Sequence, residues 1–279
     1  MSEMASGREV KRPALAVNRG FYDALWSASH VVLPQRFNTW PLLSALAASA
    51  PARLEIGPGL NPRLPIEGTH FLDVSAPALA CLKPYRACVT LGDITALPFP
   101  DSAFDLVCAF DIVEHVEDDR QVFRELSRVA KDDATVILSV PLYPARWSAF
   151  DTLVGHVRRY EPYQLLANLA EHSFSIEQSA TFGMQPRSSW LLDLAVWGLT
   201  QRPVQAMRWY NGLFRPLGLL LQRRLACTPG LIDVTNVDEV LLVCRSGVKR
   251  RRLSTTRDNA KMYELKAKGD LAHTAKRGP

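Results

Sequence analysis

The sequence predicts an α/β protein with a doubly wound, mostly parallel sheet and helices on both faces. From residue 51 onward, short apolar runs alternate with longer stretches of helical periodicity. Strands and helices that alternate in this way bury their apolar faces around a parallel sheet. Hydrophobic residues make up 47% of the 279 residues, a share that supports a sizeable core. We expect one domain with additions.

Seven segments have the composition of strands, so the sheet is predicted to be seven-stranded. They are residues 53–56, 69–73, 87–91, 104–110, 134–140, 174–182 and 238–245. Three helices are expected between them, at 75–82, 119–130 and 162–172. The second is amphipathic at helical spacing, and the third opens with Pro162, a residue favoured in the first turn.

Further segments are expected around the core, which comprises residues 51–182 and 237–247. Residues 19–50 predict an N-terminal helical cap, and residues 183–236 predict a helical insertion before the last strand. Together these parts form one domain from 19 to 247, with disordered segments at 1–18 and 248–279. The insertion contains two apolar stretches, residues 188–199 and 209–225. Neither has the ~20 consecutive apolar residues that a membrane span requires. Two roles are therefore expected as alternatives for the insertion: it covers a pocket, or it contacts a membrane surface peripherally.

The net charge of +5 is unevenly distributed. Residues 248–279 contain ten Lys/Arg and three Asp/Glu, which gives +7 and leaves −2 for residues 1–247. The tail could contact nucleic acid or the inner membrane face, but the body lacks the basic character of a nucleic-acid binder, so nucleic acid is not the expected partner. The five cysteines have no metal-binding spacing and no secretory signal precedes them, so a cytoplasmic location is expected.

The stretch RLEIGPGLNPRLP, residues 53–65, begins like a nucleotide-binding loop, with an apolar run that leads into an acidic residue and two glycines. A dinucleotide fingerprint GxGxxG would use Gly57 and Gly59 but would place Pro62 where the third glycine allows close helix packing. The acid that binds the ribose of NAD also lies about 20 residues further on, whereas Asp73 follows Gly59 by 14 residues. Both departures argue against NAD.

The pattern Glu55-x-Gly57-x-Gly59-x-Asn61 resembles the E/DxGxGxG loop of class I S-adenosylmethionine-dependent methyltransferases. The stretches FLDVS, LGDITALPF and LPFPDSAFDLVCAFDIVEHVEDD continue the match in order and are similar to the small-molecule, type 11-like branch. The resemblance implies a Rossmann-like fold with S-adenosylmethionine as cofactor. It implies a carboxylate near the cofactor's ammonium, one acid on the ribose hydroxyls and one on the adenine amino group. The implied cofactor-binding residues are Glu55, Gly57, Gly59, Asp73, Asp93, Ile94 and Phe110.

The connection between the first two expected strands departs from this family. Thirteen residues separate Gly59 from Asp73, and Pro62 and Pro65 lie among them. A parallel crossover normally contains a helix of several turns, and proline disrupts helix interiors. We therefore expect a short turn or a single helical turn, with the methionine end of the cofactor more dependent on the N-terminal helices for cover.

The stretch DIVEHV places Asp111, Glu114 and His115 on one side of any helix that begins there, and His156 follows in GHVRRYEPYQL. Such a set resembles 3-demethylubiquinone O-methyltransferases and small-RNA 2′-O-methyltransferases, in which it binds a divalent metal that lowers the pKa of a substrate hydroxyl. Here the first acid is Asp instead of Glu. A general base that titrates near neutral pH, at either histidine, is a second hypothesis, and structural packing is a third.

The neighbouring residues Arg158, Arg159 and Tyr160 are expected to bind an anionic or polar substrate, with a surface segment as the alternative. The leading functional prediction is a methyltransferase acting on a small or lipid-like biosynthetic intermediate, on oxygen more than carbon. The aromatic insertion would roof its pocket. A non-catalytic assembly partner with a methyltransferase-like fold and an RNA methyltransferase that uses the basic tail are the alternatives.

Overall fold

The computed structural model describes residues 30–183, 197–198, 201, 205 and 209–247. Its centre is an eight-stranded sheet in the order β3-β2-β1-β4-β5-β8-β6-β7. The strands are β1 (Arg53–Ile56), β2 (Thr69–Asp73), β3 (Cys88–Leu91), β4 (Phe104–Phe110), β5 (Ala130–Pro141), β6 (Ser175–Thr181), β7 (Thr228–Pro229) and β8 (Glu239–Arg245).

The first five strands are parallel, and β8 runs antiparallel to both β5 and β6. The chain moves outward from β1 to β3 and then returns to pair β4 with the free side of β1. The predicted doubly wound, mostly parallel sheet is therefore confirmed. The sheet has one more strand than predicted, because the two-residue β7 pairs with the edge of β6 inside the segment expected to be a helical insertion.

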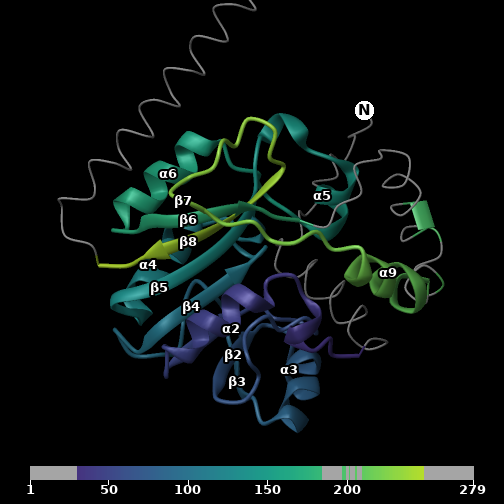
Figure 1. Ribbon diagram of the computed structural model, residues 1–279, viewed down its shortest axis with the longest axis horizontal. Coiled ribbons are helices and arrows are strands. Elements are labelled where there is room, and N and C mark those ends of the chain that lie inside the picture. The colour runs from purple at the N-terminus through teal and green to yellow at the C-terminus, as the bar shows by residue number, and fades with distance from the viewer. Residues whose placement is uncertain (1–29, 184–196, 199–200, 202–204, 206–208, 248–279) are drawn as a thin grey trace, which may run out of the picture.

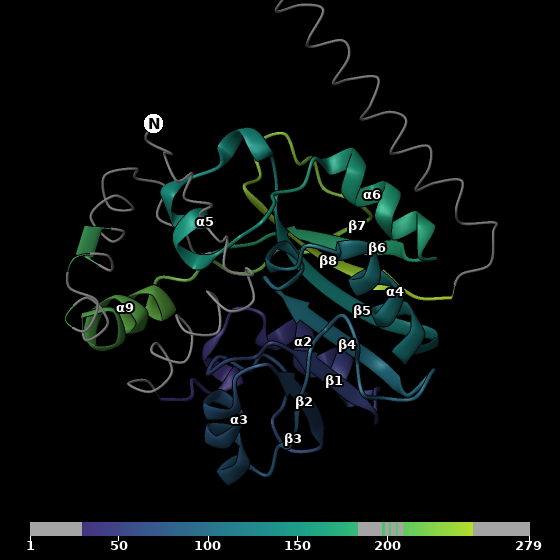
Figure 2. The same cartoon turned by 180° about the vertical axis from the view of Figure 1, so that it is seen from behind.

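The helices cover both faces of the sheet, as Figures 1 and 2 show from opposite sides. They are α2 (Trp40–Ala48), α3 (Ala76–Leu82), α4 (Asp119–Val129), α5 (Ala149–Val154), α6 (Pro162–Glu171) and α9 (Arg215–Leu220). The predicted helices at 75–82, 119–130 and 162–172 correspond to α3, α4 and α6. Residues 19–29 of the predicted N-terminal helical cap lie outside the described residues, as do the two terminal segments and much of the insertion, whereas α2 lies within the described part of the cap.

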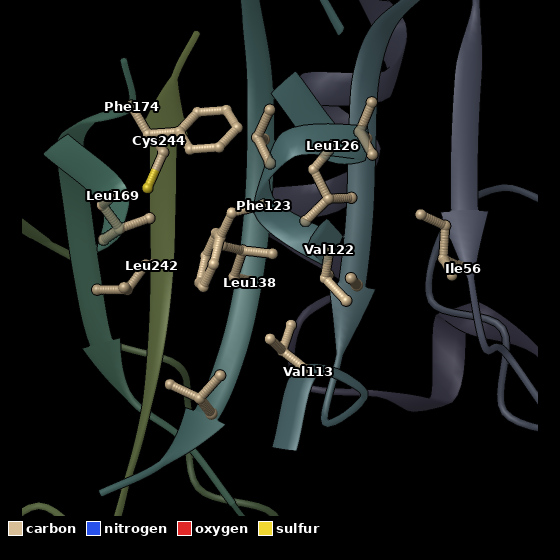
Figure 3. Packing of buried hydrophobic residues seen from close by; sticks show 14 of the residues in the cluster. Ile56, Val113, Val122, Phe123, Leu126, Leu138, Leu169, Phe174, Leu242 and Cys244 are labelled. Atoms are coloured by element: carbon tan, nitrogen blue, oxygen red, sulfur yellow. The ribbon is translucent and has the colours of Figure 1, made fainter. Parts of the chain in front are cut away.

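Alternation along β4 divides the core into two layers. Val107 and Ala109 belong to the cluster that contains α4 and α6, whereas Leu106 and Cys108 belong to the cluster beneath α2. Successive side chains of a strand point to opposite faces, which explains this division. Figure 3 shows the larger cluster, in which Phe123 and Leu126 of α4 face the strands.

The helix α4 begins where the sequence supplies a capping residue. The Asp118 side chain accepts a hydrogen bond from the backbone N–H of Gln121 at 3.0 Å, which satisfies one of the helix's otherwise unpaired donors. Val122, Phe123 and Leu126 are then buried against the sheet. This helix fixes the segment that precedes it, which carries much of the candidate site. Among the described residues, no helix is both long and apolar enough to cross a membrane.

Candidate active site

A pocket of about 250 Å³ opens at the carboxyl ends of β1 to β4. Strand order reverses between β1 and β4, and open α/β sheets bind ligands at such a reversal. The residues expected to bind the cofactor all line this pocket: Glu55, Gly57, Gly59, Asp73, Asp93, Ile94 and Phe110. The structure therefore brings together every residue of that set, from four different strands and their following loops.

The segment between β1 and β2 contains no helix, as expected from its length and prolines. Glu55 holds it in place, because its carboxylate accepts the backbone N–H of Arg63 at 2.9 Å and that of Leu64 at 2.8 Å. Burial raises the pKa of Glu55 to about 7, although these two hydrogen bonds and the charge of Arg63 act in the opposite direction. Glu55 thus organises the loop from beneath as well as lining the pocket.

Gly57 is required at its position by both backbone and space. Its φ is +66°, and an added Cβ would lie 2.2 Å from Cδ1 of Ile112. The left-handed backbone region favours glycine, and no side chain fits beside Ile112 without displacing it. This close approach joins the glycine loop to the turn after β4.

Asp73 holds the glycine loop from the neighbouring strand. Its Oδ2 accepts the backbone N–H of Gly59 at 3.0 Å, and its Oδ1 accepts that of Ser75 at 2.8 Å. Asp93 is arranged differently, because Oδ1 accepts both the N–H and the hydroxyl of Thr95, at 2.8 and 2.9 Å. Both carboxylates are therefore fixed by hydrogen bonds from the backbone or from a neighbouring hydroxyl.

The turn after β4 does not form the helix that would align three expected catalytic residues. Asp111 has a φ of +53°, and its Oδ1 accepts a hydrogen bond from the Ser139 hydroxyl at 2.5 Å. Only a single 3-10 turn, η3 (Val113–His115), follows. Ligand atoms of Glu114, His115 and His156 lie within 4.8 Å of one another, and Asp111 is not part of this group. The left-handed backbone and the bond to Ser139 explain its exclusion.

The two histidines meet edge to face, with ring centroids 4.6 Å apart. Nδ1 of His115 lies 3.3 Å from the carbonyl oxygen of Gly155, and a carbonyl can only accept, so this nitrogen donates and Nε2 is the acceptor of the neutral ring. Burial, with a smaller contribution from His156, lowers the pKa of His115 to about 3. This lowered pKa does not favour His115 as a base that titrates near neutral pH.

Glu114 is buried, with 1% of its surface exposed. Its Oε1 lies 3.8 Å from Nε2 of His156, and its Oε2 has no hydrogen-bond partner among the described residues. Burial and the nearby Asp111 raise the pKa of Glu114 well above its usual value. Glu239, at the start of β8, is a second buried acid with an unpartnered oxygen. These are the least satisfied polar groups at this edge of the sheet.

Asp151 orients His156 and was not expected from the sequence. Its Oδ1 accepts Nδ1 of His156 at 2.8 Å and Nε of Arg159 at 3.0 Å. Burial alone would raise the pKa of Asp151, but hydrogen bonds from His156, Ser148 and Arg159 hold it below its usual range. The spacing of Ser148 and Asp151 is that of a capping box, which would have indicated a helix start but not a contact to His156.

The expected substrate clamp contacts protein groups. Arg159 is buried between Asp151 and Asp238, to which its Nη1 donates at 3.0 Å. Arg158 pairs with Asp119 at 2.8 Å, and the Tyr160 hydroxyl donates to the same aspartate at 2.9 Å. None of the three expected residues lines the pocket described above. The clamp expectation is therefore not supported. Arg158 and Tyr160 hold the segment after α5 to α4, and Arg159 holds it to Asp151 of α5 and to Asp238.

Fold and pocket bring a glycine loop together with acids at the ends of the next two strands. Residues 65–138 match the family model described as "Methyltransferase domain". Ajmaline N-methyltransferase from Rauvolfia serpentina is 44% identical over 48 residues, or 17% of this chain and 16% of that enzyme. Malonyl-[acyl-carrier protein] O-methyltransferase from Erwinia billingiae is 30% identical over 145 residues, or 48% of this chain and 57% of that enzyme.

The chain thus spans less than two thirds of the length of these relatives. A solved structure of an S-adenosylmethionine-dependent methyltransferase from Thermotoga maritima has a TM-score of 0.51 at 13% identity, covering 83% of this chain and 91% of that one. The resemblance drawn from the sequence is thus borne out at the level of the domain and the fold: residues 65–138 match a methyltransferase domain, and the Thermotoga maritima structure shares the fold.

Proposed function

We propose that the protein transfers the methyl group of S-adenosylmethionine to a small or lipid-like acceptor, on oxygen in preference to carbon. The observation that carries this proposal is the convergence of Glu55, Asp73 and Asp93 on one pocket from three neighbouring strands. Ribose hydroxyls, an adenine amino group and an ammonium are all donors, which carboxylates accept. A sulfonium cation also suits a pocket whose lining is rich in acids.

Methyl transfer is a displacement in which the bond from carbon to sulfur breaks as a bond from that carbon to the acceptor forms. The protein must orient the acceptor, exclude water and receive a proton where the acceptor is a hydroxyl. His115 lines the pocket with Nε2 as acceptor, which suits it to orient a hydroxyl. Its low pKa makes it a weak base, so we assign it positioning as its main contribution.

The chemical class of acceptor rests on two supports. The relatives described above are named for an alkaloid and for a malonyl group on a carrier protein, which are organic acceptors and not nucleic acid. In this chain Trp209, Phe214 and Leu217 of the insertion are exposed apolar side chains. Such side chains favour an apolar acceptor or a peripheral membrane contact. Deleting residues 184–227 in a protein that still binds cofactor should abolish turnover, and retained turnover would contradict this assignment.

A divalent metal at Glu114, His115 and His156 is a second proposal for the same site. Both imidazoles present Nδ1 to an oxygen, of Gly155 and of Asp151 respectively, the arrangement that orients histidine ligands in metal sites. The unpartnered Oε2 of Glu114 supplies an oxygen donor. A metal held there would lower the pKa of a coordinated hydroxyl.

Calorimetric titration of the full chain with Zn²⁺, Mn²⁺ and Mg²⁺ tests the metal proposal. Binding should disappear in His156→Gln and persist in Asp111→Asn, because Asp111 lies outside the cluster. Absence of binding by all three metals, or equal loss in both variants, would contradict the assigned ligand set.

The methyltransferase proposal is tested first by cofactor binding. Calorimetry should show that the protein binds S-adenosylmethionine and S-adenosylhomocysteine but neither NAD nor NADP. A non-catalytic assembly partner would bind none of the four. Asp73→Asn should weaken binding of both adenosyl ligands, and an unchanged affinity would remove the ribose assignment.

Metabolite comparison between a deletion strain and its parent then identifies the acceptor. An accumulated compound and a missing product 14 mass units heavier, about the mass of one added CH₂, would name it. The RNA alternative predicts steeply salt-dependent RNA binding that is lost when residues 248–279 are removed. Failure of that binding in the full chain leaves the small acceptor as the proposal.

A further inference from the structure

The connection between β1 and β2 lacks a helix whose N-terminus, with its partial positive charge, usually lies beside the ligand in a doubly wound fold. In such folds a helix follows the glycine loop, and its N-terminus carries partial positive charge and free N–H donors. In this chain residues 57–68 are all described and none is helical. Any anionic group of a ligand at this end of the pocket must be stabilised by something else.

Arg63 supplies a positive charge in that segment. Among the described residues that line the pocket it is the only Lys or Arg, whereas Glu55, Asp73, Asp93 and Asp111 line it as acids. Its backbone is fixed because its N–H donates to the buried Glu55 carboxylate. The position of Arg63 at the pocket is thus set by the structure of the loop.

Three aromatic rings hold the guanidinium of Arg63. Its Cζ lies 3.8 Å from the ring centroid of Phe37, 6.0 Å from that of Phe110 and 5.8 Å from that of Phe182. Phe37 follows the N-terminal turn η1 (Pro34–Arg36), and the other two rings lie at the ends of β4 and β6. Stacking on rings restrains the orientation of an arginine side chain, and its planar fork of donors matches the geometry of a carboxylate.

We propose that Arg63 binds the α-carboxylate of the cofactor's methionine end, in place of the missing helix N-terminus, while Glu55 faces its ammonium. This inference rests on the proposed use of S-adenosylmethionine. An α-amino acid presents one anion and one cation on a single carbon, and Arg63 and Glu55, which both line the pocket, form the complementary pair. The rest of the lining, with its acids, suits the nucleoside and the sulfonium.

Decarboxylated S-adenosylmethionine separates this role from general support of the loop. It retains the nucleoside, sulfonium and ammonium but lacks the carboxylate. By calorimetry on the full chain, Arg63→Met should lower the affinity for S-adenosylmethionine about 10- to 100-fold, the range for losing a hydrogen bond between charged groups. Its affinity for the decarboxylated ligand should not fall. Arg63→Lys, which keeps the charge, should recover part of the loss.

The matched control is Arg146→Met. Arg146 also stacks on an aromatic ring, with Cζ 4.5 Å from the Tyr143 centroid, but it does not line the pocket, so its substitution should leave both affinities unchanged. Equal losses for the two ligands in Arg63→Met would assign Arg63 to loop structure and overturn the inference.

A measurement on the unchanged protein guards against a variant that does not fold. The wild type should bind S-adenosylmethionine at least about tenfold more tightly than the decarboxylated ligand. Equal affinities would mean that no group reads the carboxylate, and the inference would fail. If the wild type bound neither ligand, the proposed function itself would fail, which is a distinguishable result.

Discussion

Two buried glutamates at neighbouring positions of the same sheet edge have opposite surroundings. Glu55, at the end of β1, accepts backbone hydrogen bonds from Arg63 and Leu64. Glu114, after β4, has an oxygen with no hydrogen-bond partner among the described residues. Each has 1% of its surface exposed, so burial alone does not distinguish them.

The contrast between Glu55 and Glu114 divides the carboxyl edge of the sheet into two parts. Around β1 to β3, hydrogen bonds from the following loops fix the acids at the strand ends, so this part of the pocket is well organised. Around η3 and α5, acids and imidazoles face one another, and some polar atoms lack partners. Buried unpartnered polar atoms are costly in a folded protein, and they concentrate where a ligand, a proton or a metal can complete them.

The largest expected effect is a loss of stability when Glu55 is removed from the part of the edge around β1 to β3. Glu55→Ala leaves two buried backbone donors without their acceptor, at about 1–3 kcal/mol each, so we expect the free energy of unfolding to fall by about 4 kcal/mol. Urea denaturation measures this change. Glu67→Ala is the control, because Glu67 is exposed in the same connection. A loss below about 1 kcal/mol for Glu55→Ala would show that the loop does not depend on this carboxylate.

The pH dependence of stability gives a second test of Glu55. Its pKa is about 7 in the folded protein against a usual 4.5, so the folded state favours the protonated form. That stabilisation is complete below pH 4.5 and is lost as pH rises through 7, which amounts to about 3 kcal/mol. Denaturation from pH 4.5 to 8 should therefore show a decline in stability that is about 3 kcal/mol smaller in Glu55→Gln than in the wild type. Parallel curves would contradict the raised pKa.

In the part of the edge around η3 and α5, substitutions should change the rate of turnover more than the stability. His115→Gln should lower turnover of the identified acceptor about 100-fold, because it removes the group that orients the hydroxyl. The unfolding free energy should change much less. With its pKa near 3, His115 should add no ionisation to the rate profile between pH 5 and 9. A step near pH 6.5 that disappears in the variant would instead make His115 a titrating base.

A smaller effect is expected at Asp93, whose Oδ1 already accepts from Thr95. Asp93→Ala should weaken cofactor binding by about 1–3 kcal/mol, the range for a donor left without its acceptor. Calorimetry with S-adenosylhomocysteine measures it, and Asp101→Ala, in an exposed turn, is the control. Unchanged affinity would remove Asp93 from the adenine contact.

The part of the edge around β1 to β3 could be predicted from the sequence, whereas the arrangement around η3 and α5 could not. Apolar runs at 53–56, 69–73 and 104–110 matched β1, β2 and β4 residue for residue, and acids at their ends necessarily meet at one edge. The positive φ of Asp111 and the bond from Asp151 to His156 depend on how distant loops pack. No local pattern encodes them, so the arrangement around η3 could not be derived from spacing.

The smallest expected effect is also the most direct test of the comparison. In Glu114→Gln the new amide occupies a position where Oε2 accepts nothing, and burial raises the pKa of Glu114 well above its usual value, which favours the neutral carboxyl. A neutral group of the same shape then replaces a neutral group. The unfolding free energy of the metal-free protein should change by less than about 1 kcal/mol, whereas Glu55→Ala should cost about 4 kcal/mol because two backbone donors lose their acceptor. Denaturation of both variants side by side, with chelator present, measures the contrast. Equal losses would mean that Glu114 is as tightly held as Glu55, and that the edge is uniform.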